Sequence, residues 1–232
     1  MGACDLKLLH APNFALDVEL DVNVRTKIRC EHSYIEEAVL SIGEETLHVS
    51  SFGNCAINGV SHADLSVGIS GFPIVCSHPH DKVHSFEILL GDGEKIALKT
   101  FKDMVAVNVD HLHADRFHGS VGMMGAFDKH GAMLGRDGTT VISDPNDFAA
   151  EWQVREDESV LFPTAREPQH PQACVLPAAA TKESRLRRRL AETATREEAE
   201  KACANWPEDR VEMCVQDVMA TGDLDLASAG AF

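Results

Sequence analysis

The sequence predicts a mainly β protein: an antiparallel β-sandwich with a small helical hairpin at its C-terminal end. Three observations lead to this fold class. Apolar and polar residues alternate through the first two-thirds of the chain, turns containing Gly or Asn separate short apolar runs, and helical patterns occur only near the C-terminus. Many short strands at regular spacing are typical of two packed antiparallel sheets. We therefore expect a β domain over 1–162, a Pro-rich connector over 163–182 and a helical hairpin over 183–232.

The strand pattern is clearest in two segments, 16–24 and 105–109, where valines and leucines alternate with mostly polar residues. Such alternation predicts strands with one face on a core and the other face in water. The Gly-Asp-Gly at 91–93 lies between two apolar runs and predicts a hairpin turn. Further short strands are predicted over 38–42, 46–50, 65–69, 86–90 and 96–100.

Past residue 162 the signals change from strand to helix. Four prolines between 163 and 180 oppose both a helix and a strand ladder, so this part is predicted to be an extended connector. Thr195 stands three residues before Glu198, which is the spacing of a capping box at a helix start. A second helix is predicted over 208–219, with Gly222 at its end.

Composition excludes some classes of function. The chain has 232 residues and 44% hydrophobic content, enough for a sizeable core, so wholesale disorder is not expected. Its net charge of −16 argues against a nucleic-acid partner, because phosphate binding needs a basic surface. No apolar stretch reaches the length of a membrane span. Motifs for a serine nucleophile, a P-loop or a dinucleotide site are missing from the sequence, which favours a non-catalytic protein.

The most informative stretch begins with a glycine-punctuated turn at 119–125, continues through an acidic loop, and ends in Asp-Phe-x-x-x-Trp-x-Val at 147–154. This order of parts resembles the C-terminal half of a von Willebrand factor type D domain. There, a Gly-Leu-Cys-Gly turn precedes a calcium loop and a final strand. The Gly-Ala-Cys at 2–4 matches the Gly-x-Cys after the family's first strand. The family's opening Gly-Asp-Pro-His motif does not precede it, so we expect a type D domain truncated at its N-terminus.

The resemblance implies roles for several side chains. Trp152 and Phe148 are expected in the core, where the last strand closes the sandwich. Met124 replaces the cysteine of the family's glycine turn, and the usual partner of that cysteine lies near the missing opening motif. Cys4 is then expected to pair with Cys174, which lies beyond the final strand.

The segment over 197–227 is similar to the one that follows type D domains in some mucin-like and algal or diatom proteins. This resemblance implies a disulfide between Cys203 and Cys214 across two helices. The chain has seven cysteines, so at least one stays outside any intramolecular pair. Three cysteines in the strand-rich region have no counterpart in the family, and both buried thiols and disulfides stay open for them: Cys30, Cys55 and Cys76.

Two kinds of metal site follow from the sequence. The resemblance implies a calcium site with Asp128 and Asp137 as ligands, because calcium binds carboxylate and carbonyl oxygens. The alternative is a zinc-dependent hydrolase at His111, His113 and His118, since three imidazoles and a water form a hydrolytic zinc site. His111 and His113 are expected on one face of a strand, with His118 nearby. Histidines also cluster at 78, 80 and 84. Polar loops without any ion account for the same residues.

For the chain as a whole, the resemblance implies a non-catalytic extracellular or cell-wall-associated module for adhesion or matrix assembly. Its partners would be an extracellular protein or polysaccharide matrix. The first residues lack the basic segment and apolar run of a signal peptide. This leaves an intracellular scaffold with reduced cysteines as a further hypothesis.

Overall fold

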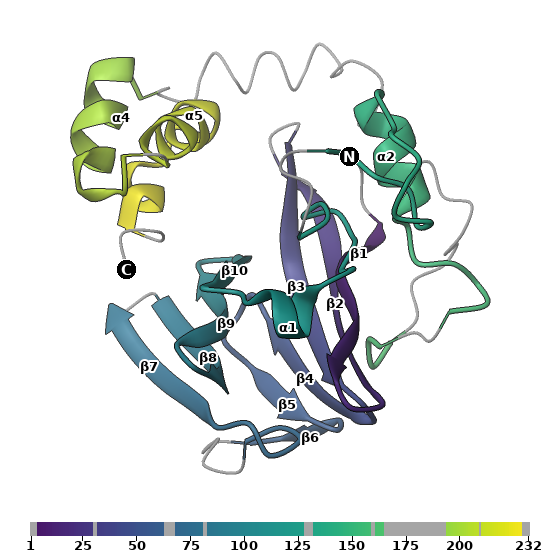
Figure 1. Cartoon of the computed structure of the whole chain (residues 1–232). Coiled ribbons are helices and arrows are strands. Elements are labelled where there is room, and N and C mark those ends of the chain that lie inside the picture. Colours follow the sequence, from purple (N-terminus) through teal and green to yellow (C-terminus); the bar gives the residue numbers. More distant parts are fainter. Residues whose placement is uncertain are drawn as a thin grey trace. The chain divides into compact units, whose positions relative to one another are not determined.

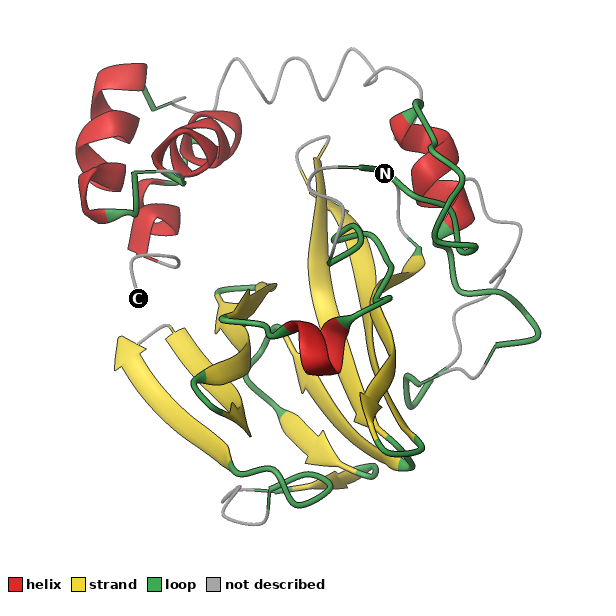
Figure 2. Ribbon diagram, viewed as in Figure 1, coloured by secondary structure: helices red, strands yellow, loops and turns green. Residues whose placement is uncertain are grey.

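A computed structural model describes residues 4–29, 32–62, 68–80, 83–127, 132–158, 161–164, 194–208 and 210–228. The chain divides into a β unit (Met1–Ile28 and Ser33–Leu176) and a helical unit (Arg29–His32 and Pro177–Phe232). Figures 1 and 2 show antiparallel sheets and a few short helices, so the predicted fold class is confirmed. None of the described helices has the length and hydrophobicity needed to cross a membrane.

The β unit contains two antiparallel sheets. Six strands form the first sheet in chain order: β1 (Asp5–Ala15), β2 (Val18–Arg29), β3 (His32–Ile42), β4 (Glu45–Ser50), β5 (Cys55–Ile57) and β6 (Val60–Ser61). Four strands form the second sheet in the order β10-β9-β8-β7: β7 (Ile74–His80), β8 (Val83–Gly91), β9 (Glu94–Phe101) and β10 (Met104–Asp110).

One hydrophobic core is shared by both sheets. Each buried Leu, Ile or Val stabilises the fold by roughly 1.5–3 kcal/mol relative to an exposed one, so these residues dominate the packing energy. Fully buried members come from the first sheet and the second sheet alike: Leu20, Val22, Leu40 and Leu47, and Ile88, Ile96 and Leu98.

The single strand predicted over 16–24 is wrong at its start. Leu16 is 91% exposed in a turn between β1 and β2, where Asp17 adopts a left-handed φ of 55°. Further along β2, the face that was predicted to meet water is also buried. Arg25 is 4% exposed, donates to both Asp5 carboxylate oxygens at 2.8 Å, and lies 4.4 Å from the Phe162 ring centre. A distant segment therefore covers this face, which local alternation does not reveal.

The other predicted strands show where local signals suffice. The turn at 91–93 does join β8 to β9, and Asp92 and Gly93 both have positive φ there. The segments 38–42, 46–50, 86–90, 96–100 and 105–109 lie within β3, β4, β8, β9 and β10. Of the strand predicted over 65–69, residues 65–67 are outside the described residues, and Ile69 forms only an isolated bridge with Phe72. Pattern analysis missed β1 and β7, which contain Pro12 and Pro79.

The helical unit contains α4 (Arg196–Ala202), a 3-10 turn (Cys203–Asn205), α5 (Val211–Thr221) and a second 3-10 turn (Leu224–Ser228). The predicted capping box is present: the Thr195 hydroxyl accepts from the Glu198 amide, and Glu198 accepts from the Thr195 amide. Gly222 ends α5 with a φ of 70°. The predicted disulfide between Cys203 and Cys214 is also present, with a Cα–Cα distance of 6.0 Å.

The described part of the β unit contains two further helices, α1 (Ala114–Phe117) and α2 (Pro145–Glu151). The strand expected before Trp152 is instead the helix α2. The Asp144 carboxylate caps it by accepting from the Asn146 and Asp147 amides, and Pro145 occupies the first turn. An N-cap followed directly by proline is a helix-start signal that the sequence does contain.

Candidate functional site

The stretch that resembles a type D domain closes the edge of β1. His10 and Val121 exchange two backbone hydrogen bonds, of 2.7 and 2.9 Å. Further along, the Lys7 amide donates to the Trp152 carbonyl at 2.8 Å, and the Val154 amide donates to the Asp5 carbonyl at 2.9 Å. The glycine turn and the tryptophan segment thus satisfy backbone groups that an edge strand otherwise leaves open.

Trp152 is the centre of a second apolar cluster. Its side chain is 1% exposed, and its indole Nε1 donates to the Leu134 carbonyl oxygen at 2.9 Å. Phe148, which is 6% exposed, and Val121 share the cluster. The two residues expected in the core, Trp152 and Phe148, are therefore both buried, one of them on α2.

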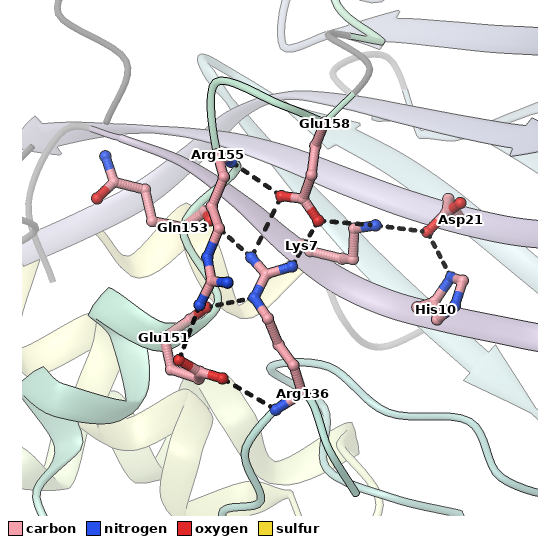
Figure 3. Close-up of polar contacts among 8 residues, drawn as sticks. All are labelled: Lys7, His10, Asp21, Arg136, Glu151, Gln153, Arg155 and Glu158. Atoms are coloured by element: carbon pink, nitrogen blue, oxygen red, sulfur yellow. Dashed lines mark hydrogen bonds and ion pairs between the residues drawn. The ribbon is translucent and has the colours of Figure 1, made fainter. Parts of the chain in front are cut away.

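Arg136 lies at the centre of a polar network beside this cluster (Figure 3). Its guanidinium donates to the backbone carbonyls of Glu151 and Gln153, each at 2.7 Å. It also donates to Glu158 Oε1 at 2.5 Å, and its Cζ lies 5.2 Å from the centre of the Trp152 ring. Because one planar group binds carbonyls and a carboxylate of a single segment, it fastens that segment in place. Sequence reasoning missed Arg136, since nothing local distinguishes it from a surface arginine.

The network continues to the first two strands (Figure 3). Lys7 Nζ lies 3.5 Å from Glu158 Oε1 and 3.3 Å from Asp21 Oδ1. His10 Nδ1 lies 3.0 Å from the same Asp21 oxygen. Burial raises the pKa of Asp21, but the hydrogen bond with His10 and the positive charge of Lys7 outweigh burial and leave this pKa below its usual value.

Among the described residues, His10, Glu19 and Asp21 are the one group whose potential metal-ligand atoms all lie within 4.8 Å of one another. The Lys7 ammonium already supplies a positive charge 3.3 Å from Asp21. We therefore interpret His10 and Asp21 of this group as part of the ion-pair network.

The network predicts a dependence of stability on pH. Burial raises the pKa of Glu158, but hydrogen bonds from Arg136 and the Arg155 amide, with the charge of Lys7, leave it below the usual value of 4.5. A carboxyl with a lowered pKa in the folded state stabilises it above the unfolded pKa, and this contribution is lost as the pH falls through the folded pKa. We expect Glu158→Gln to cost roughly 1–2 kcal/mol at neutral pH and to flatten the loss of stability below about pH 4.5.

Urea unfolding of both proteins between neutral and acidic pH measures this effect. Glu156→Gln is the matched control, because Glu156 is exposed and two residues away. Parallel pH profiles for wild type and Glu158→Gln would contradict the prediction.

Asp137, one of the two predicted calcium ligands, closes a tight turn. Its Oδ1 accepts from the Thr139 and Thr140 amides, both at 2.8 Å, and its Oδ2 accepts from the Thr140 hydroxyl at 2.6 Å. That hydroxyl, with the two amides, holds the pKa of Asp137 well below its usual range. Asp128 lies outside the described residues, so a calcium site shared by these two residues stays a prediction.

The turn gives Asp137 a role that needs no ion. We expect Asp137→Ala to lower the melting temperature by a few degrees, and to do so equally in calcium and in chelator, because three local hydrogen bonds are lost. Asp137→Asn keeps one acceptor oxygen and should lose less. Thermal melts of the three proteins in calcium and in chelator test this. A loss confined to the calcium samples would assign Asp137 to the ion.

The histidines of the proposed hydrolytic site are spread around α1. His111, expected on a strand, follows the end of β10 and has a left-handed φ of 57°. His113 and His118 stand at the two ends of α1. In the described part of the chain, the nitrogens of these three histidines do not form a group within 4.8 Å. The expectation of two histidines on one strand face is wrong, because the left-handed residue ends the strand.

Glu94 gives this region a structural role that the sequence did not reveal. Its side chain is 1% exposed, and it accepts from the His113 amide at 2.6 Å. Arg116 Nη1 lies 3.3 Å from the other Glu94 oxygen, and the same guanidinium donates to the Leu90 carbonyl. A buried carboxylate with these partners anchors α1 to the second sheet.

The remaining cysteines have separate environments. Cys4 is fully buried, and its amide donates to the Thr26 hydroxyl at 3.0 Å. Cys174 and Cys30 lie outside the described residues, so the pairing of Cys4 with Cys174 stays a prediction. Cys55 donates from Sγ to the His62 carbonyl at 3.4 Å, and burial raises the pKa of this thiol.

Comparisons with known proteins do not extend this description. No protein-family model matches the chain, and a search of curated proteins finds no match. The structure therefore defines the protein by its architecture: an antiparallel β-sandwich and a small helical unit that contains an internal disulfide.

Proposed function

We propose that this chain is a non-catalytic, type D-like module of a secreted or cell-wall-associated protein, and that it takes part in adhesion or matrix assembly. The observation that carries the proposal is the disulfide between Cys203 and Cys214 in the helical unit. Disulfides persist in oxidising compartments and are rare in the cytosol.

Two further features support the same proposal, one of the β unit and one of the whole chain. The described parts of the segment that resembles the family are held on β1 by backbone hydrogen bonds and by the Arg136 network. Those polar groups bind one another, which suits a rigid scaffold better than a reaction centre. The net charge of −16 suits a cationic protein or polysaccharide partner, because opposite charge steers association.

The disulfide is tested on protein made by its natural host. Thiols are alkylated under denaturing, non-reducing conditions before trypsin digestion. Cleavage after Lys201 and Arg210 separates the two cysteines, so the bond should link peptide 202–210 to the peptide that begins at Val211. We expect this linked pair in the extracellular or wall fraction. Alkylated Cys203 and Cys214, with the protein in the cytosolic fraction, would refute the proposal.

The interaction itself needs a second measurement. We expect a tagged chain to stay with the insoluble matrix at low salt and to elute as salt screens its charge, since screening shortens electrostatic range. The matched control is a chain with several exposed acidic residues neutralised. Equal retention of both proteins at every salt concentration would contradict a charge-based interaction.

A further inference from the structure

Outside the region described so far, a cavity of about 440 Å³ lies at an end of the sandwich. Its lining comes from the β5–β6 region of the first sheet and from β7 and β8 of the second. The lining includes sulfur and imidazole groups together with a core aromatic ring: Cys55, His62, Cys76, His78, His84 and Phe86. No Asp, Glu, Lys or Arg is among the described residues that line it.

Strand register places three of these groups on the face of the second sheet that carries the core. Cys76 on β7 pairs with Phe86 on β8, and Phe86 is a buried core residue. Side chains two residues apart share a face of a strand. His84 accordingly continues this face beyond Phe86. The β7–β8 register is irregular between Ser77 and His80, but His78 lies beside His84, with ring centres 4.6 Å apart. At this end of the sheet, imidazole and thiol groups stand where aliphatic residues stand elsewhere.

The opposite wall brings Cys55 to the same cavity. Cys55 begins β5, directly after a loop that contains Gly53. A Cβ atom on Gly53 would lie 2.9 Å from His84 Cδ2, so the loop packs directly against the imidazole ring. Gly53 also has a φ of 80°, which favours glycine. The Gly53 loop of the first sheet and His84 of the second sheet are thus in direct contact beside the cavity.

We propose that this cavity binds a zinc ion through Cys55, Cys76, His78 and His84. Two thiolates and two imidazoles are a common tetrahedral zinc set, and soft sulfur ligands select against calcium and magnesium. No three of the four ligand atoms lie within 4.8 Å of one another, so binding requires these side chains to rotate inward. Each cysteine releases its proton to the buffer as its sulfur binds the ion. The ion would link the two sheets at this end of the sandwich.

The test uses the full chain, stripped of metal by chelation and kept under nitrogen so that its thiols stay reduced. Zinc is added in competition with a chromophoric chelator, and bound ions are counted by native mass spectrometry. We expect one zinc ion per chain, a higher melting temperature and proton release. Cobalt(II) in place of zinc should give thiolate-to-metal charge-transfer absorption, which histidines alone do not produce.

Variants assign the ligands. We expect Cys55→Ser and His84→Ala each to weaken zinc binding by at least ~100-fold, because groups that only support a ligand already contribute 10–100-fold. His111→Ala is the matched control, since it removes an exposed histidine of the other cluster and should change nothing. Thermal melts in the presence of chelator show whether each variant folds. If Cys55→Ser does not fold, Cys76→Ser is used in its place.

Three results would overturn the proposal. These are full zinc binding by both cysteine variants, an equal loss in the His111→Ala control, and a disulfide between Cys55 and Cys76 in the native protein. None of them bears on the disulfide in the helical unit, so the two proposals fail independently.

Discussion

Trp152→Ala is expected to destabilise the β unit by ~3–5 kcal/mol, the usual range for deleting a buried tryptophan. The indole is 1% exposed among Phe148, Val121 and their neighbours, so its removal leaves a cavity in the smaller cluster. The variant also loses the hydrogen bond to Leu134 and the face on which Arg136 lies. With about 2–4 °C per kcal/mol for a domain of this size, the melting temperature should fall by roughly 10 °C.

Calorimetry and circular dichroism of the full chain measure the effect. Trp152→Phe helps to separate the two causes, since it loses the N–H donor but keeps most of the apolar volume; we expect a cost of about 1–2 kcal/mol. Trp206→Ala is the matched control. It removes the same side chain from the helical unit, where Trp206 donates to the Ala227 carbonyl, and should leave the β-unit transition unchanged. A Trp152→Ala protein that melts like wild type would refute the packing role of Trp152.

Gly122→Ala is expected to cost about 2–4 kcal/mol, from overpacking and backbone strain combined. Gly122 has a φ of 143°, which side chains rarely adopt. A Cβ there would lie 2.4 Å from the Leu8 carbonyl oxygen and 3.0 Å from Leu9 Cα. Both atoms belong to the backbone of β1, so neither can move away by rotation of a side chain. The turn would have to leave the strand edge that it covers.

Gly119→Ala is the control for this variant. Gly119 also has a positive φ, of 75°, but the nearest atom to its Cβ would be 3.9 Å away. Both variants carry backbone strain, which is larger at the φ of Gly122, and only Gly122→Ala carries the clash. The difference between their unfolding free energies therefore gives the combined cost of the clash and of the extra strain. In Gly122→Ala, the His10 amide should also exchange its hydrogen faster than in wild type, because this amide donates to the Val121 carbonyl beside the turn. Equal losses of unfolding free energy in the two variants would show that the turn does not need glycine for its packing on β1.

These two variants also bear on the resemblance to type D domains. Gly122 and Trp152 belong to the two motifs that carry it, and both contact β1 through the backbone of their own segments. If both substitutions unfold the β unit in one transition, the motifs act as parts of one scaffold. Loss of matrix binding without loss of stability would instead place a binding surface at these residues.

Local chemistry was enough to predict some elements. The turn at 91–93 depends on residues that tolerate positive φ, and the Thr195–Glu198 capping box depends on two side chains three residues apart. Gly222 ends α5 for a similar reason. The disulfide of Cys203 with Cys214 was expected from resemblance, and it spans only 11 positions. In these cases the residues that make the deciding contacts are close together in the sequence.

Long-range contacts decided the rest. Leu16 follows the alternating pattern yet lies exposed in a turn, while Arg25 is buried because Thr164, 139 residues away, accepts its hydrogen bonds. Alternation by itself determined that the chain forms strands around an aliphatic core. Tertiary structure alone decided which faces are covered, which carboxylates Arg136 and Lys7 meet, and which cysteines and histidines share a cavity. The physical reason is that side-chain periodicity records only a residue's own strand, whereas burial and charge pairing depend on which other segment packs on it.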